Sequence, residues 1–470
     1  MKKIFVFLLL LCCSTSCFKD SDINIDPNRS VSVDPALLFS GAATQLSLLR
    51  VGELTWPIAL GSQMWASGAR WGLAQAQYDQ TRIRSAWGKT YTDVLKNLGV
   101  AVKLAETTTP VPRNAVAQCK ILQAFTYSQT SFLWGDIPFS EAANGEVNWP
   151  KFDKQQDVLN GCLALLDEAL GMIDTNSKGI IAPNDLYYGG DMVKWKKFAN
   201  SLKLRILFAM VDSDGTKAAA IGKIVTDGSG ITSVADAMQF KYFNEPGRQN
   251  PRFSFTAIFR GGVQSDWYCS KPVYDLLVSL KDPRIPYFFQ PGPEAGANEY
   301  IALNSVESYT TKSALVSLNL LKADLPEVSF SYSEQLLFEA EAYARGFASG
   351  GFEIATTKLR AGVSASLISF GVPAAQAEAY ATSLPALTAA NYKDVLAKQQ
   401  YLDLFMRPVE GWTQHRRSGV TGQEIPVMTP PVGSPVTGLM RRLLYRNEEL
   451  NSNPNTPSGI ALDVPQWFDK

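Results

Sequence analysis

The sequence predicts a mainly α-helical protein, and three observations support this fold class. Apolar residues recur at spacings of three and four along several long segments, helix-start signals precede some of these segments, and the strict alternation typical of β-strands is scarce. The chain has 470 residues, of which 46% are hydrophobic and 19% are charged. It can therefore bury a sizeable core.

The first predicted helix covers residues 36–49. It is preceded by Asp34, an N-cap residue, and by Pro35, whose missing N–H is tolerated at the first helical position. A second helical pattern covers residues 81–106. The intervening residues 66–79 are rich in Gly and Ala and only weakly helical, so we expect a loop there.

Residues 113–134 carry two stripes of apolar or small side chains on one predicted helix. Two such faces indicate that neighbours cover the helix on both sides, as in a stacked α-solenoid. Gly135 follows as a helix stop. Asp153 and Asp191 are predicted to act as N-caps of the next two helices.

The C-terminal half alternates between irregular and helical segments. Residues 228–270 and 283–330 are richer in Gly, Pro, Asn and Ser, with only short helices or strands expected. The tail from residue 418 to 470 is Pro-rich and irregular. Helical patterns return at residues 333–349, 352–370 and 388–415.

The N-terminus has the pattern of an export signal that ends at a lipidated cysteine. Lys2 and Lys3 precede the apolar residues 4–11, a run too short to span a bilayer as a helix. The small residues 14–16 stand directly before Cys17, as a lipoprotein signal peptidase requires. We therefore predict lipidation of Cys17, with an ordinary secretory signal as the alternative.

The chain is accordingly expected to have three parts. Residues 1–16 are the predicted signal peptide, residues 17–33 a lipidated tether, and residues 34–470 a single domain. Several acyl chains would hold the protein stably on a membrane, because each buried methylene contributes about 0.8 kcal/mol.

Composition argues against nucleic-acid and metal binding. The 44 basic and 44 acidic residues give a formal charge of zero without a basic patch, so no nucleic-acid partner is expected. Cys119, Cys162 and Cys269 are widely spaced and form no C-x-x-C pair, so we expect buried free thiols. An EF-hand beginning at Asp20 would need Glu where Val31 stands. No metal and no cofactor are predicted.

Catalysis is not indicated by the histidine content. His415 is the only histidine, so no Ser–His–Asp or Cys–His arrangement has another base available. We expect His415 to be a surface or capping residue. Two carboxylates suited to glycoside hydrolysis stay an alternative, because the acidic residues offer many pairs. The prediction is a protein that is not an enzyme.

Two segments rich in aromatic residues are the candidate ligand-binding sites. Flat aromatic side chains supply a large and rigid contact area for a ligand, while polar neighbours hold its hydrogen-bonding groups. Residues 63–91 interleave both kinds of side chain in a predicted loop, and residues 260–268 do so around two glycines that permit a tight turn. The predicted ligand-binding residues are Trp65, Trp71, Tyr78, Arg260, Asp266, Trp267 and Tyr268.

Each of these segments has a second interpretation. Trp65 and Trp71 are equally compatible with core positions, and Trp87 continues the phase of the following helix and is expected in the core. The second segment is also compatible with a simple turn before a helix that begins at Lys271.

Short phrases from one end of the chain to the other carry a family resemblance. They are Cys17 with DINIDPN (22–28), WGDIPFSEA (134–142), DLYYGGDMVKWKKFANSLKLRILFAM (185–210), KDPRIPYF (281–288), the AEA core of SEQLLFEAEAYARG (333–346), GVSASLISFGV (362–372), AKQQYLDLF (397–405), EGWTQHRRSG (410–419) and VPQWFDK at the C-terminus. Together these phrases resemble the SusD/RagB family, specifically its SusD-like outer-membrane lipoproteins. The resemblance covers residues 17–470, whereas residues 289–330 match none of its phrases. Gln414 and His415 also replace a more usual acidic or aromatic pair.

The resemblance implies a right-handed superhelix of TPR-like helix pairs with irregular inserted loops that carry ligand contacts. It also implies core positions for the tryptophans of the shared phrases, Trp134, Trp195, Trp412 and Trp467.

Function is implied by the same resemblance. Such proteins capture a nutrient, most often an oligosaccharide, and act as a lid on a SusC-like TonB-dependent transporter without being enzymes. Cargo of another kind, such as a peptide, stays open. The polar and acidic residues 18–22 resemble the surface-export signal of Bacteroidota lipoproteins, which implies a lipid-anchored protein on the outer face of the outer membrane.

Overall fold

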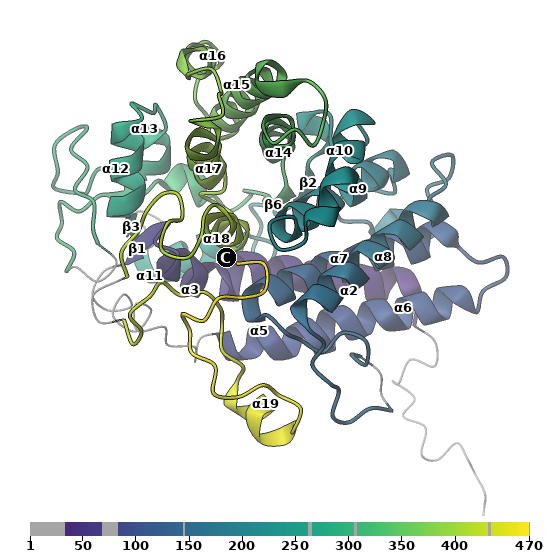
Figure 1. Cartoon of the computed structure of the whole chain (residues 1–470). Helices are drawn as coiled ribbons and strands as arrows, with labels where there is room; N and C mark the ends of the chain where they lie inside the picture. The colour runs from purple at the N-terminus through teal and green to yellow at the C-terminus, as the bar shows by residue number, and fades with distance from the viewer. Residues whose placement is uncertain are drawn as a thin grey trace, which may run out of the picture. The chain divides into compact units, whose positions relative to one another are not determined.

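Helices dominate the part of the chain that the structure describes, which confirms the predicted mainly α class (Figure 1). The computed structural model describes residues 33–67, 83–143, 146–261, 266–304, 308–430 and 434–469. The chain divides into two units after Asp34, and all elements below belong to the unit Pro35–Lys470. Cys17, the predicted signal peptide and nearly all of the predicted tether lie outside the described residues.

Consecutive helices of the N-terminal half pack side by side. In Figure 1, α2, α6, α7 and α8 form a layer in which α2 contacts α6, α6 contacts α7, and α7 contacts α8. Such sequential packing is typical of helical solenoids. The elements are α2 (Pro35–Leu48), η1 (Leu49–Glu53), α3 (Thr55–Gly61), α5 (Arg84–Lys89), η3 (Thr90–Leu95), α6 (Lys96–Glu106), α7 (Arg113–Trp134), α8 (Gln155–Met172), α9 (Met192–Met210) and α10 (Ala218–Thr226).

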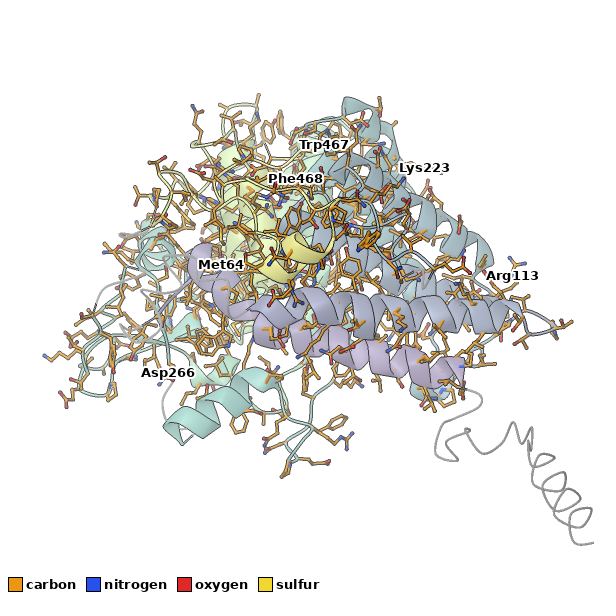
Figure 2. The ribbon with its side chains drawn as sticks, turned by 90° about the horizontal axis from the view of Figure 1, so that it is seen from below. Met64, Arg113, Lys223, Asp266, Trp467 and Phe468 are labelled. Carbon is orange, nitrogen blue, oxygen red and sulfur yellow. The ribbon has the colours of Figure 1, made fainter. Side chains whose placement is uncertain are left out.

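Helix α7 is buried on almost every side, as its two stripes predicted. It lies between α6 and α8 and also contacts α2 and α9. Gly135 ends the helix with a φ of 91°, a left-handed conformation that glycine adopts without steric cost. Figure 2 shows Arg113, the first residue of α7, at one end of the unit and Asp266 towards the other end.

Two small antiparallel sheets occupy segments that the sequence left irregular. The first has the strand order β1-β3-β5-β4, and in the second β2 pairs with β6. The strands are β1 (Trp65–Ser67), β2 (Met238–Phe240), β3 (Trp267–Cys269), β4 (Phe289–Gln290), β5 (Leu315–Val316) and β6 (Glu327–Phe330). Around them lie α11 (Pro251–Arg260), α12 (Lys271–Ser279), α13 (Ile285–Phe288) and the 3-10 turns η4 (Ala182–Asn184), η5 (Gly215–Lys217), η6 (Val234–Asp236) and η7 (Leu318–Leu320).

The C-terminal half adds a second group of helices and an irregular tail, drawn in green and yellow in Figure 1. The predicted helical segment 388–415 is divided into α17 and α18, because Pro408 can begin a helix but not continue one. The short Ala-rich α16 was not predicted. The helices are α14 (Tyr332–Ala344), α15 (Gly351–Ser369), α16 (Ala374–Ser383), α17 (Tyr392–Asp403), α18 (Pro408–Arg417) and α19 (Asn447–Ser452).

One of the predicted N-caps is confirmed and another is wrong. The Asp191 carboxylate accepts a hydrogen bond from the Lys194 N–H at 3.1 Å at the start of α9. Helix α8 begins at Gln155 instead, and the Asp153 carboxylate accepts from the Ser140 N–H at 2.8 Å. A backbone bridge between Ile137 and Asp153 places this carboxylate beside the preceding loop rather than over the helix end.

The predicted core residues are mostly confirmed. Burial of Trp87, Trp134, Trp195 and Trp412 agrees with the sequence, whereas Trp467 is only partly buried against the core. The predicted free thiols are also found in the interior: Cys119, Cys162 and Cys269.

His415 is buried, so its predicted surface position is wrong. The residue lies within α18, 4% exposed, and its Nε2 lies 2.8 Å from the Pro426 carbonyl oxygen. A carbonyl can only accept, so Nε2 carries the proton. Burial lowers the pKa of His415 to about 4, and the nearby charges of Arg441 and Arg416 act in the same direction.

The folded protein is therefore expected to lose stability in mild acid through His415. Its pKa is lower when folded than the ordinary 6.5, so below pH 6.5 the unfolded chain binds a proton that the folded chain does not. We expect the free energy of unfolding to fall as pH drops from 6.5 towards 4, by at most about 1.4 kcal/mol per pH unit. Urea unfolding of wild type and His415→Gln across this range measures the effect. An equal pH dependence in both proteins would contradict it.

Candidate functional site

The two aromatic segments predicted to bind ligand meet in the first sheet. Strands β1 and β3 pair in antiparallel fashion, with Trp65 opposite Cys269 and Ser67 opposite Trp267. The rings of Trp65 and Trp267 lie 5.0 Å apart, edge to face. The fold thus brings together residues that are far apart in the sequence.

The aromatic rings of these strands face the interior. Trp65 and Trp267 are fully buried, Tyr268 is 1% exposed and Asp266 is 7% exposed. The expectation that Trp65 and Trp267 lie in loops with exposed rings is therefore corrected. Strand pairing places both rings in a core cluster that also holds Phe405. Neither tryptophan ring presents a face to solvent. Ligand binding by these residues stays a prediction.

The remaining predicted site residues cannot be placed. Trp71, Tyr78 and residues 262–265 lie outside the described residues. Arg260 ends α11, but its side chain is also outside the described part.

Tyr309 is a surface residue beside this sheet that the sequence interpretation missed. It is 42% exposed, and its ring lies 5.1 Å from the Tyr268 ring. A second pair, Tyr274 and Tyr300, has ring centroids 6.4 Å apart. Tyr309 and Tyr300 belong to the Gly-, Pro- and Asn-rich segment that matched no shared phrase. Aromatic residues in such a segment were the signal that singled out Trp65, and the same signal could have found these tyrosines.

A cavity of about 370 Å³ lies near this sheet and is called the α18 cavity below. Its size is in the range of small-ligand sites. Helix α18, β6 and α11 contribute to its walls, and the Arg252 guanidinium on α11 lies 5.8 Å from the Trp65 ring. Charged residues of the lining are Arg50, Arg252, Glu327, Asp403, Arg407 and Glu410, and the apolar residues include Leu320, Leu325, Tyr332, Phe370 and Met406.

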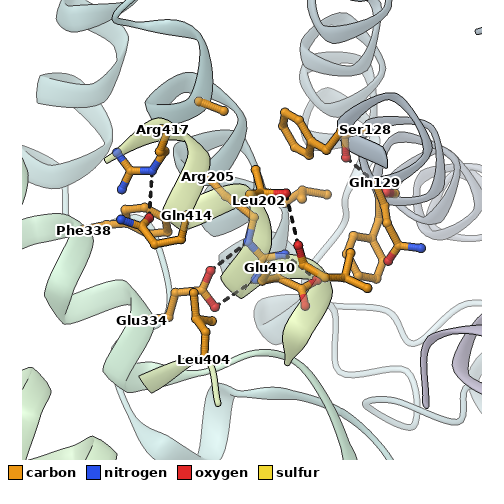
Figure 3. A pocket seen from close by; sticks show the side chains of 15 residues that line it. Ser128, Gln129, Leu202, Arg205, Glu334, Phe338, Leu404, Glu410, Gln414 and Arg417 are labelled. Atoms are coloured by element: carbon orange, nitrogen blue, oxygen red, sulfur yellow. Dashed lines mark hydrogen bonds and ion pairs between the residues drawn. The ribbon is translucent and has the colours of Figure 1, made fainter. Parts of the chain in front are cut away.

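A buried network of ion pairs forms the charged wall of the α18 cavity. Arg50 contacts both Glu327 and Glu410, each at 2.8 Å. Arg407 pairs with Glu334 and contacts Asp403 at 2.7 Å. In Figure 3, Glu334 and Glu410 lie on either side of Arg205, which donates to Glu334 at 2.8 Å. The network joins residues from η1, α9, β6, α14, α17 and α18.

The network keeps Glu410 ionised. Burial by itself would raise the pKa of Glu410, but the charges of Arg50 and Arg205 outweigh burial and lower it. Arg50 behaves in the matching way, since Glu410 and Glu327 raise its pKa against the effect of burial. A glycosidase acid needs a carboxyl group with a raised pKa. Glu410 is therefore suited to an ion pair and not to proton donation.

The sequence matches one protein family over most of its length. This SusD-like family is described as "Starch-binding associating with outer membrane", and the match covers residues 27–439. The chain belongs to the SusD-like family. This confirms the resemblance stated from the sequence phrases.

Solved structures similar to this SusD-like chain cover nearly all of it. A chitin-binding protein has a TM-score of 0.79 at 21% identity, covering 93% of this chain and 100% of its own. A SusD/RagB family protein from Bacteroides thetaiotaomicron has 0.77 at 19%, covering 93% and 99%. A SusD homolog from Bacteroides uniformis has 0.76 at 19%, covering 92% and 99%. At these levels of sequence identity, the similarity shows only that the folds are alike. No curated protein matches the sequence.

Two further features of this SusD-like chain concern membranes and metals. Among the described residues, no helix combines the length and hydropathy needed to cross a bilayer. Within the same ranges, His, Cys, Asp and Glu side chains nowhere gather in threes as a metal site would require.

The buried ion pairs are expected to be essential for stability. Arg50→Met would leave Glu327 and Glu410 buried without their closest partner, which typically costs about 3–5 kcal/mol. The matched control is Lys223→Met, which removes an exposed pair with Asp227 and should cost less than about 1 kcal/mol. Guanidinium unfolding of both variants measures the difference. Equal effects would show that the network is not a stabilising element.

Proposed function

We propose that this SusD-like protein is a cell-surface lipoprotein that binds an oligosaccharide and delivers it, as a lid, to a SusC-like TonB-dependent transporter. The observation that carries the proposal is the family match over residues 27–439, whose description joins starch binding to outer-membrane association. The fold similarity to a chitin-binding protein over that protein's whole length supports a carbohydrate ligand. The export and lipidation pattern ending at Cys17 supports the membrane anchor.

We place the first contact with the oligosaccharide at the aromatic residues around β1 and β3. Tyr309 offers an exposed ring beside Tyr268, and Trp71 and Tyr78 belong to the adjoining sequence segment. Sugar C–H faces stack on such rings, and the polar side chains Arg260 and Asp266 would hold hydroxyl groups. Trp65, Trp267 and Tyr268 are themselves buried in the paired strands β1 and β3.

Removing single aromatic rings of the proposed site is expected to weaken glycan binding. Trp71→Ala and Tyr309→Ala should each lower affinity by about tenfold, because a stacking ring contributes roughly 1 kcal/mol beyond its buried area. Trp149→Ala is the matched control, since Trp149 is 60% exposed and lies elsewhere on the chain. A glycan array on the mature protein identifies the ligand, and calorimetry with the three variants measures the affinities.

The same measurements separate the competing functions. If both ring variants bind every glycan as tightly as wild type, the aromatic site is wrong. If a peptide library yields ligands and the glycan array does not, the cargo is a peptide. Turnover of an oligosaccharide that a single Glu or Asp substitution abolishes would instead indicate a glycoside hydrolase.

Lipidation is expected to matter for uptake and not for binding. Cys17→Ala removes the anchored residue, so affinity in vitro should match wild type while uptake of the glycan by cells should be strongly reduced. Cys12→Ala changes a signal-peptide cysteine that is not expected to carry lipid, and it should leave uptake intact. Fluorescent-glycan uptake measures both. Normal uptake with Cys17 replaced would contradict the lid.

A further inference from the structure

We propose that the α18 cavity is a second sugar site, which takes one or two rings of a neutral saccharide with Arg252 as its principal hydrogen-bond donor. This site goes beyond the aromatic contact proposed above, although it rests on the proposed function for the sugar character of its ligand. The supporting observations are a buried arginine without a carboxylate partner among the described residues, a balanced charge and a wall of mixed polarity.

Arg252 is the arginine of this cavity that lacks a carboxylate partner among the described residues. It is 6% exposed, its Nη2 donates to the Thr55 hydroxyl at 3.0 Å, and its Nε has no hydrogen-bond partner in the described part of the chain. Arg50 and Arg407, in contrast, each contact two carboxylates. A buried guanidinium with unused donors is costly unless a ligand or water accepts from it. Burial lowers the pKa of Arg252 to about 10, in keeping with this incomplete pairing.

The charges of the cavity favour a neutral ligand. Its lining holds three arginines, Arg50, Arg252 and Arg407, and three carboxylates, Glu327, Asp403 and Glu410, so the described charges sum to zero. A charged ligand would add a buried charge that has no counter-ion in the cavity. Hydroxyl groups can accept from Arg252 and donate to a carboxylate without changing the balance.

The remaining lining fits a sugar ring. Tyr332 and Phe370 are partly buried and supply aromatic faces for C–H groups. The amide of Gln239 can both donate and accept. Val234, which is 68% exposed, and the exposed Ser369 also line the cavity, so it is open to solvent at this side. A sugar entering there would meet the aromatic and apolar lining together with the buried charges.

The test replaces Arg252 and measures disaccharide affinity. Maltose and N,N′-diacetylchitobiose are the neutral probes, and glucuronate is the charged one. Arg252→Met should lower the affinity for the neutral disaccharide that binds by about 10- to 100-fold, the effect of losing hydrogen bonds from a charged donor. The variant keeps the apolar stem and leaves each cavity carboxylate its arginine partner, so it should fold.

Arg248→Met is the matched control, because Arg248 is exposed and forms a surface ion pair with Glu245 at 2.8 Å. It should bind both disaccharides like wild type. Gln239→Ala provides a second, milder change in the cavity and should weaken the same ligand. Thermal unfolding with and without disaccharide verifies folding and should show ligand stabilisation that Arg252→Met loses.

Several outcomes would overturn this site. Unchanged affinity in Arg252→Met and Gln239→Ala would do so, as would tighter binding of glucuronate than of either disaccharide, or no binding of both disaccharides at millimolar concentration. If glycan binding depends on Trp71 and Tyr309 but not on Arg252, the proposed function stands and the cavity site alone fails. If no glycan binds the wild-type protein, both fail.

Discussion

Helix α18 connects separate parts of the chain through buried charged side chains that must all find partners. Its Glu410 accepts from Arg50 of η1, and its Arg417 donates to Glu341 of α14 at 2.8 Å. Its Arg416 donates to the carbonyl oxygens of Phe132 in α7 and Arg441 in the tail. A buried charge without such partners would cost several kcal/mol, so these segments can pack around α18 in only one arrangement.

The neighbourhood of Arg416 shows how carbonyl groups and aromatic faces can replace a counter-ion. The guanidinium lies 3.9 Å from the centre of the Trp412 ring and 4.9 Å from that of Phe468. Burial lowers its pKa to about 9, partly opposed by the charge of Asp469. The irregular tail is thereby attached to the helical core, although it contains only one helix among its described residues.

The buried ion pairs and the residues proposed to bind ligand are different side chains. The ion pairs of the α18 cavity keep their charges and hold helices together, which leaves Arg252 as the group with unused donors. The Arg252 guanidinium also lies 5.8 Å from the Trp65 ring of β1.

Local signals were enough for much of the fold. Residues 113–134 were predicted as a helix covered on two sides, and α7 has these bounds. Neighbouring elements cover it because apolar or small side chains occupy most of its faces. Asp191 caps α9 because its carboxylate lies within reach of an N–H three residues later. Asp153 had the same local signal, but a long-range bridge to Ile137 engages it elsewhere.

By itself, the sequence determined the helical class, most helix positions, the burial of the cysteines and the family, because periodicity and shared phrases are local properties. Only the tertiary structure decided that Trp65 and Trp267 are buried in paired strands, that His415 lies inside, and that Arg252 lines the α18 cavity without forming an ion pair among the described residues. Each of these outcomes depends on contacts between residues far apart in the chain. A local sequence pattern does not predict which side chains these contacts bury. It also does not predict which buried groups lack a hydrogen-bond partner.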